Sequence, residues 1–233
     1  MKLYPLVLSN RLVTNIGRIS KEIKMNVLIK EVNIRELDTL IVIGNGTPDD
    51  IAFSLIGHHL NGNKIVWIVK PERTRFGVID LIPKYLEMGI RTILLLIDQE
   101  DDSVSTIHKE IKKIIKKLTK GESVVVEDES VERLKIYKGK YGSKDFELIL
   151  VINGLDEIGK GKHSIEDHLL KVAEEISLGV GKVDNPKEAW SSIPEENQLK
   201  VFKELKARSD LVESAFPQQI LGCRYLERNT QGS

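Results

Sequence analysis

The chain lacks the residues and runs that mark several classes of protein. It has a single cysteine, Cys223, among 233 residues, so it can form no intramolecular disulfide, and a zinc site built on paired thiolates is excluded. The apolar run at residues 3–8 is too short to cross a membrane and contains a proline. Neither a signal peptide nor a membrane span is therefore expected, and the expected location is the reducing cytoplasm.

An excess of either charge is also missing. Lys and Arg together number 35, as do Asp and Glu, so the chain has no overall basic field of the kind that attracts nucleic acid without specificity. Any binding of phosphate must be local. With 41% hydrophobic residues the chain can build a packed core, and the abundance of Lys, Glu and Ile resembles the composition of heat-adapted proteins.

Apolar runs alternate with amphipathic stretches through the middle of the chain, a rhythm typical of βαβ units. Helices are expected at 49–60 and 78–88, and a third is expected to start near 101–102 and to keep an apolar face over 107–118. Strands are expected at 39–43, 65–69, 93–97, 124–126 and 146–152. A hairpin-like stretch at 133–144 precedes the last strand. The fold class is therefore α/β, with a mostly parallel or mixed central sheet flanked by helices. A strand at 3–8 and a helix at 13–24 are expected before it.

The feature that most clearly suggests a functional site is an acidic turn directly after the apolar run 93–97. Asp98, Glu100 and Asp102 are candidate metal ligands there, because ligands of open α/β sheets bind at the carboxyl ends of the strands. Carboxylates at such an edge suit Mg²⁺. Asp98 and Glu100 occupy alternate positions and would point to one side if the extended chain continues through Gln99. The alternative is that these residues serve the N-terminus of the next helix.

Two further segments are expected at the same edge if the strands at 39–43, 65–69 and 93–97 are parallel. Asp49 and Asp50 follow the first strand and are possible additional acidic ligands. Lys70, Arg73 and Arg75 follow the second strand and are candidate phosphate-binding residues, unless they are only solvated loop charges. The glycine turn at 44–46 fits neither common phosphate-binding pattern and favours a tight turn over an anion site.

The later part of the chain is expected to be helical. Ser164 and Asp167 resemble a capping box at a helix start, and Glu166 and Asp167 are further possible ligands unless they only offset the helix dipole. Residues 1–183 are read as the α/β domain with an N-terminal extension, and residues 184–233 as a helical C-terminal tail. That tail could cap the core or form the interface of a homo-oligomer.

Three segments together resemble Toprim domains, in particular the stand-alone archaeal and OLD-nuclease-like branch. They are the runs Leu40-Ile41-Val42-Ile43-Gly44, Leu95-Leu96-Ile97-Asp98-Gln99-Glu100-Asp101-Asp102 and His163-Ser164-Ile165-Glu166-Asp167-His168-Leu169-Leu170. The likeness covers about residues 38–176. It implies a compact α/β fold and the chemistry of topoisomerases, primases and related nucleases.

The resemblance also implies roles for particular positions. The paired acidic ligands for Mg²⁺ would fall on Asp98 and Glu100, and Glu166 with Asp167 resembles a late acidic pair of that branch. The glutamate that acts as general acid or base would fall on Ile43, which can neither transfer a proton nor bind metal. We therefore expect a Toprim-like module that binds nucleic acid or a nucleotide and is catalytically degenerate. The alternative is a Mg²⁺-dependent nuclease or phosphotransferase acting on phosphodiesters.

Overall fold

A computed structural model describes most of the chain. The described residues are 2–7, 10–25, 39–44, 46, 48–60, 65–70, 75–120, 125–128, 131–159, 161–181 and 184–229.

The strands form one mixed sheet with the order β1-β3-β2-β4-β7-β6-β5. Their bounds are β1 (Lys2–Val7), β2 (Thr39–Val42), β3 (Ile65–Lys70), β4 (Thr92–Asp98), β5 (Val125–Asp128), β6 (Leu134–Tyr141) and β7 (Lys144–Asn153). The pairs β1–β3, β3–β2, β2–β4 and β4–β7 are parallel, whereas β6 runs antiparallel to both β7 and β5. The predicted α/β class and mixed sheet are confirmed, and β2, β3 and β4 meet the condition of being parallel.

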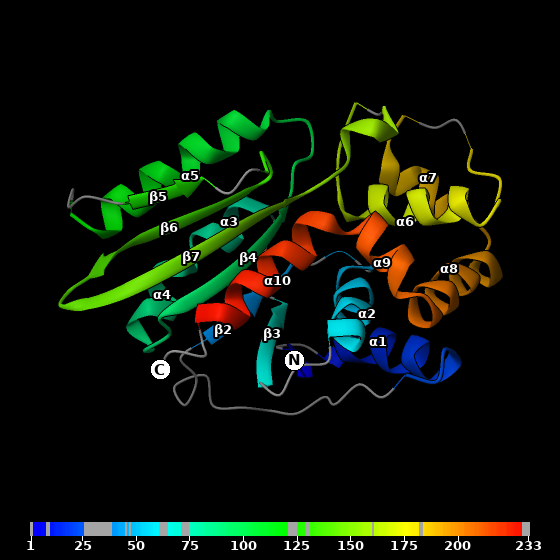
Figure 1. Cartoon of the computed structure of the whole chain (residues 1–233), viewed down its shortest axis with the longest axis horizontal. Coiled ribbons are helices and arrows are strands. Elements are labelled where there is room, and N and C mark those ends of the chain that lie inside the picture. The colour runs from blue at the N-terminus through cyan, green and yellow to red at the C-terminus, as the bar shows by residue number, and fades with distance from the viewer. Residues whose placement is uncertain are drawn as a thin grey trace.

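Helices cover both faces of this sheet (Figure 1). Their bounds are α1 (Asn10–Glu22), α2 (Asp49–Leu60), α3 (Arg75–Ile79), α4 (Ile82–Glu87), α5 (Val104–Leu118), α6 (Ile165–Glu175), α7 (Pro186–Ser192), α8 (Glu195–Ala207), α9 (Ser209–Ala215) and α10 (Pro217–Asn229), with a short 3₁₀ turn at η2 (Asp156–Ile158). Within the described ranges, no helix has both the length and the apolar character needed to span a membrane.

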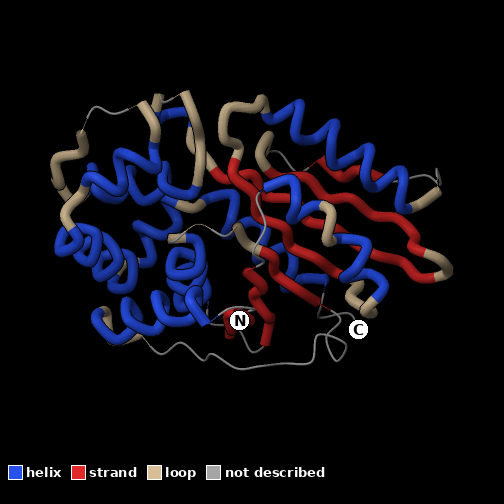
Figure 2. The backbone as a smooth tube through the Cα atoms, turned by 180° about the vertical axis from the view of Figure 1, so that it is seen from behind, coloured by secondary structure: helices blue, strands red, loops and turns tan. Residues whose placement is uncertain are grey.

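The central strands bury both of their faces, which is why they read as unbroken apolar runs. Alternate residues of β4 point to opposite sides: Leu94 and Leu96 join a core that includes α2, α6 and α10, whereas Leu95 and Ile97 join one with α4 and α5. Figure 2 is seen from behind and shows the side of the sheet that α4 and α5 cover. The result is a three-layer α/β/α arrangement.

Two local predictions were wrong in detail. The helix expected at 78–88 is divided into α3 and α4, with Pro83 in the first turn of α4. Proline has no amide hydrogen to donate and is tolerated mainly in the first turn of a helix. A helix therefore starts at this position, and one continuous helix does not pass through it. Ser164 is the N-cap of α6, and the Asp167 carboxyl has a hydrogen bond with the main chain of Ser164, but the Ser164 side chain makes no capping hydrogen bond, so only half of the predicted capping box is present.

The C-terminal helices share the core of the sheet. Phe216 and Cys223 are fully buried in the cluster that contains Leu94 and Val151. Helix α10 approaches the strands closely at Gly222, where an added Cβ would lie 2.8 Å from Val151 Cγ2 and 3.2 Å from Leu94 Cδ1. Glycine is therefore needed at this position for α10 to pack against β4 and β7.

We predict that Gly222→Ala lowers the free energy of unfolding by about 1–3 kcal/mol, because the methyl group must displace a stiff valine in a filled core. The matched control is Gly17→Ala, also inside a helix, where an added Cβ meets nothing within 4 Å. That control should raise stability by about 0.5–1 kcal/mol through helix propensity alone. Urea unfolding followed by circular dichroism measures both, and a stabilising Gly222→Ala would contradict the close packing of α10.

Candidate functional site

The alternation of β4 and β7 places a carboxylate and an amide side by side where both strands end. Asp98 is in register with Asn153, and both continue the face on which Leu96 and Val151 lie. Asn153 Nδ2 donates to Asp98 Oδ1 at 3.1 Å, and the main-chain N–H of Ile165, the first residue of α6, donates to the same oxygen at 3.1 Å. Asp98 thus satisfies a free amide at a helix start while the helix dipole stabilises its charge.

Glu100 follows in a left-handed main-chain conformation, with φ of 56°. Regular strand structure ends at Asp98, the N–H of Gln99 still donates to the carbonyl oxygen of Asn153 at 3.2 Å, and the left-handed Glu100 then breaks the extended chain. Two main-chain hydrogen bonds with His163 hold the turn, from Glu100 N–H at 2.7 Å and from His163 N–H at 3.0 Å. An uncommon conformation that is fixed from outside in this way is typical of functional sites.

Lys187, from α7, joins these two carboxylates. Its Nζ lies 3.3 Å from Asp98 Oδ2 and also forms an ion pair with Glu100 Oε1. Burial favours the neutral amine, yet the pKa of Lys187 is raised well above its usual range by Asp98, Glu100 and Glu166. The ammonium therefore experiences three carboxyl groups. We call Asp98, Glu100, Glu166 and Lys187 the edge cluster.

Glu166 is the most unusual member of the edge cluster. Its side chain stands on the first turn of α6 and is only 5% exposed, and its Oε2 has no hydrogen-bond partner among the described residues. Burial, together with the nearby charge of Asp98, raises the pKa of Glu166 to about 7. Burial also raises the pKa of Asp98, although Lys187 and Asn153 oppose that shift. Negative charge is therefore costly here unless a cation balances it.

Asp167 serves a different set of contacts from its neighbour Glu166. Its Oδ2 accepts from the main-chain N–H of Leu155 at 3.1 Å and lies 2.7 Å from His163 Nδ1. Burial raises the pKa of Asp167, and its hydrogen bonds with Leu155 and His163 oppose the shift. The carboxylate orients the imidazole so that Nε2 is the ring nitrogen left to accept a proton.

A buried histidine connects the C-terminal helices to this site. His168 Nδ1 lies 2.5 Å from the carbonyl oxygen of Ala215, and its Nε2 accepts from the N–H of Gly154 and from Gln219 Nε2, both at 3.0 Å. Gln219 Nε2 also donates to Asn153 Oδ1 at 2.9 Å. Burial lowers the pKa of His168 to about 3, so the ring is neutral. These contacts hold Asn153 in the orientation that serves Asp98.

The other acidic candidates lie on different parts of the edge. Asp49 and Asp50 are buried at the start of α2, where Asp50 Oδ1 accepts from the N–H of Ile51 at 2.9 Å. The Asp49 carboxylate lies over the glycine turn, since a Cβ at Gly44 would sit 2.7 Å from Asp49 Oδ1. A carboxylate in that position supports the tight-turn interpretation.

Asp102 participates through its main chain, because its carbonyl oxygen accepts from Gln99 Nε2 at 2.9 Å. Ser103, rather than an acidic residue, caps α5 by accepting from the N–H of Thr106 at 3.1 Å. For the predicted phosphate-binding residues, Arg73 and the side chains of Lys70 and Arg75 lie outside the described residues. Ile43 is 1% exposed and packed in the core.

Sequence reasoning missed Lys187, Asn153 and the pairing of His163 with Asp167. The alternation of the two buried strands could have placed Asn153 beside Asp98, given their parallel register. The spacing of His163 and Asp167 by four residues around a helix start was a second usable signal. Lys187 is separated from Glu100 by 87 positions, and no local pattern in the sequence indicates their contact.

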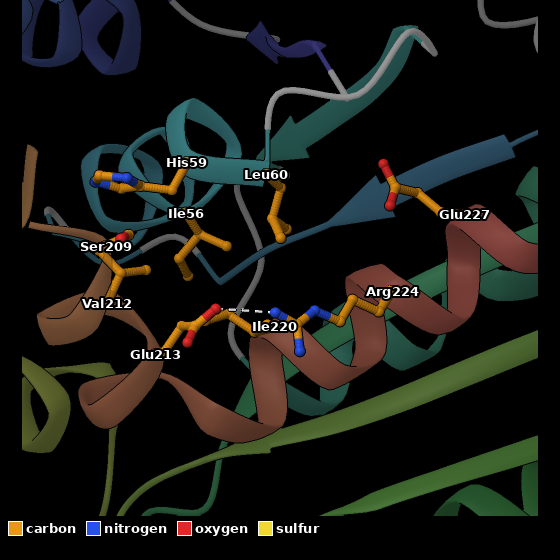
Figure 3. A pocket seen from close by; sticks show the side chains of 9 residues that line it. All are labelled: Ile56, His59, Leu60, Ser209, Val212, Glu213, Ile220, Arg224 and Glu227. Carbon is orange, nitrogen blue, oxygen red and sulfur yellow. Dashed lines mark hydrogen bonds and ion pairs between the residues drawn. The ribbon is translucent and has the colours of Figure 1, made fainter.

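A cavity of about 310 Å³ lies elsewhere, between α2, α9 and α10. Figure 3 shows its apolar lining from Ile56 and Val212 and the ion pair of Arg224 with Glu213, whose atoms are 2.9 Å apart. None of the predicted site residues that the structure describes lines it.

Across the described residues, no group of three or more His, Cys, Asp or Glu side chains is arranged to hold a metal ion as the structure stands. The Lys187 ammonium lies among the carboxylates instead. Comparison with known proteins finds no matching family model, no matching curated protein and no matching solved structure.

The buried carboxyl of Glu166 leads to a prediction about pH. Its pKa of about 7 exceeds the unperturbed value of 4.5, so its contribution to stability is present below about pH 4.5 and is lost as the pH rises through 7. The free energy of unfolding of Glu166→Gln, measured in EDTA, should therefore rise relative to wild type between pH 5 and pH 8. The relative gain should be on the order of 3 kcal/mol at most.

Glu174→Gln is the control, because Glu174 is exposed on the same helix. Its stability should follow the wild-type profile over the same pH range. A constant difference between Glu166→Gln and wild type from pH 5 to pH 8 would show that Glu166 does not titrate as a buried acid.

Proposed function

We propose that this chain is a Toprim-like module that binds a phosphate-containing ligand, nucleic acid or a nucleotide, through a divalent cation at the edge cluster. Asp98, Glu100 and Glu166 would hold the cation. The observation that carries the proposal is the buried Glu166 Oε2, which lacks a hydrogen-bond partner among the described residues although its carboxyl lies close enough to Asp98 for the two charges to interact. Buried carboxylate oxygens of native proteins are normally paired, and a bound cation is one way to satisfy an exception.

The donors have the chemistry that Mg²⁺ or Mn²⁺ requires. Asp98, Glu100 and Glu166 offer hard carboxylate oxygens. Asp98 and Glu100 stand at the carboxyl end of β4, where open α/β sheets place their ligands, and Glu166 stands on the first turn of α6. A bound Mg²⁺ would neutralise charge on a phosphate oxygen. Three carboxyl groups face one ammonium, so the edge cluster can carry more negative than positive charge and favours an added cation.

The packing of Ile43, directly after β2, supports binding rather than efficient catalysis. The position at which the resemblance implies a proton-transferring glutamate is Ile43, whose side chain is fully packed against the same core as Ile41 and Leu96. A carboxyl at that position would be buried among apolar groups at a cost of several kcal/mol. Ile43 therefore fits a structural role, and the general acid or base that the resemblance implies at this position is missing.

Isothermal titration with Mn²⁺ tests the proposal. Wild type should bind Mn²⁺, and Asp98→Ala should lose at least about tenfold in affinity, because a bound cation loses a direct charged ligand. Asp101→Ala is the matched control, since Asp101 is exposed in the same turn, and it should bind like wild type. Equal isotherms for all three proteins would remove the cation site.

A second function, Mg²⁺-dependent phosphodiester cleavage, is favoured by one observation. Asp167 and His163 form a dyad, and the His163 side chain is 12% exposed. The main chain of His163 is hydrogen-bonded to the main chain of Glu100, a member of the edge cluster. A histidine oriented by a carboxylate can accept a proton from an attacking water. It would supply the base that Ile43 cannot.

Nicking of supercoiled DNA in Mg²⁺ separates the two functions. We expect wild type to nick feebly, and His163→Ala and Asp98→Ala to leave that level unchanged, because a binding module does not depend on a base. Strong wild-type nicking that falls by about 10²–10⁴-fold in His163→Ala, the usual contribution of general base catalysis, would show that the protein is a nuclease.

A further inference from the structure

Lys187 occupies a place in the edge cluster where positive charge is favoured. Its Nζ contacts both Asp98 and Glu100, and the charge of Glu166 also acts on it. An ammonium group offers one positive charge and donors only, so it can balance these carboxylates in part. It leaves Glu166 Oε2 without a hydrogen bond.

The lysine is held by its own charge and not by tight packing. Its side chain is 42% exposed, whereas the helix that carries it is anchored by buried Ala189 and by Trp190, whose ring lies 5.6 Å from that of Phe202. Asn185 caps the same helix by accepting from the N–H of Lys187 at 3.0 Å. The main chain of α7 is therefore fixed independently, and the four-carbon stem can swing toward water without moving the helix.

We infer that Lys187 is a tethered substitute for the divalent cation, which must leave Asp98 and Glu100 before that cation binds and which then meets the phosphate of the ligand. The inference rests on the proposed function and adds an order of events to it. While Lys187 neutralises the carboxylates it is not available to an anion, and once released it is a free ammonium at the rim of the site. Cation and phosphate binding are then coupled, each raising the affinity for the other.

The first arm of the test measures Mn²⁺ alone by isothermal titration at pH 8. Lys187→Met keeps most of the stem and removes the competing charge, so its affinity for Mn²⁺ should be about tenfold higher than that of wild type. Lys187→Arg should bind Mn²⁺ more weakly than wild type, because a guanidinium grips carboxylates with two parallel hydrogen bonds. The control is Lys171→Met, which removes a lysine paired with Glu157 at 2.7 Å, and it should match wild type.

The second arm measures a short fluorescent single-stranded oligonucleotide by anisotropy, with and without Mn²⁺. Wild type and Lys171→Met should bind more tightly when Mn²⁺ is present. Lys187→Met should show a smaller gain although it binds Mn²⁺ better, because it has no ammonium to release. Opposite effects of one substitution on the two ligands are not expected of a lysine that only stabilises the fold.

The outcomes separate the inference from the function on which it rests. If wild type binds Mn²⁺ and Asp98→Ala does not, but Lys187→Met binds no more tightly, the substitute role is wrong and the cation site stands. A tighter Lys187→Arg would also overturn the inference. If neither wild type nor Lys187→Met binds Mn²⁺, the proposed function fails and the inference fails with it. Should Lys187→Met not fold, the comparison of wild type with Lys187→Arg decides the question.

Discussion

The burial of the Asp98 charge is the constraint on which this end of the molecule depends. A carboxylate at the end of a fully covered strand is costly unless hydrogen bonds and a counter-charge accompany it. The N–H of Ile165, the amide of Asn153 and the ammonium of Lys187 supply them, from three elements that are distant in sequence. Meeting that requirement fixes where α6 begins, how β7 ends and where α7 must lie.

Sequence reasoning succeeded where a single element carries its own signal. The limits of α2 and the apolar runs of β3 and β4 follow from period and burial alone, and the structure confirms them within a residue or so. Asp98 and Glu100 could be chosen because they leave such a run directly. The division of the helix expected at 78–88 was missed because Pro83 was not weighed as a start signal.

The candidate site was only half visible for a different reason. Two of its carboxylates belong to one turn, but the residues that pair with them come from β7, α6 and α7, whose contacts with the turn are purely tertiary. Glu166 and Asp167 are neighbours, and nothing in the sequence favours one over the other as a metal ligand. The structure separates them, since Glu166 joins Asp98 and Lys187 whereas Asp167 orients His163.

The C-terminal helices gain a role from this arrangement beyond covering apolar surface. His168 is neutral because it is buried, and a neutral ring with Nδ1–H directed at Ala215 must present Nε2 as an acceptor. Gln219 and the N–H of Gly154 fill that acceptor, and Gln219 in turn fixes Asn153 beside Asp98. A displacement of α10 would therefore disturb the orientation of Asn153. The tail therefore serves the edge cluster in two ways: α7 supplies Lys187, and α10 sets the orientation of the Asn153 amide through Gln219.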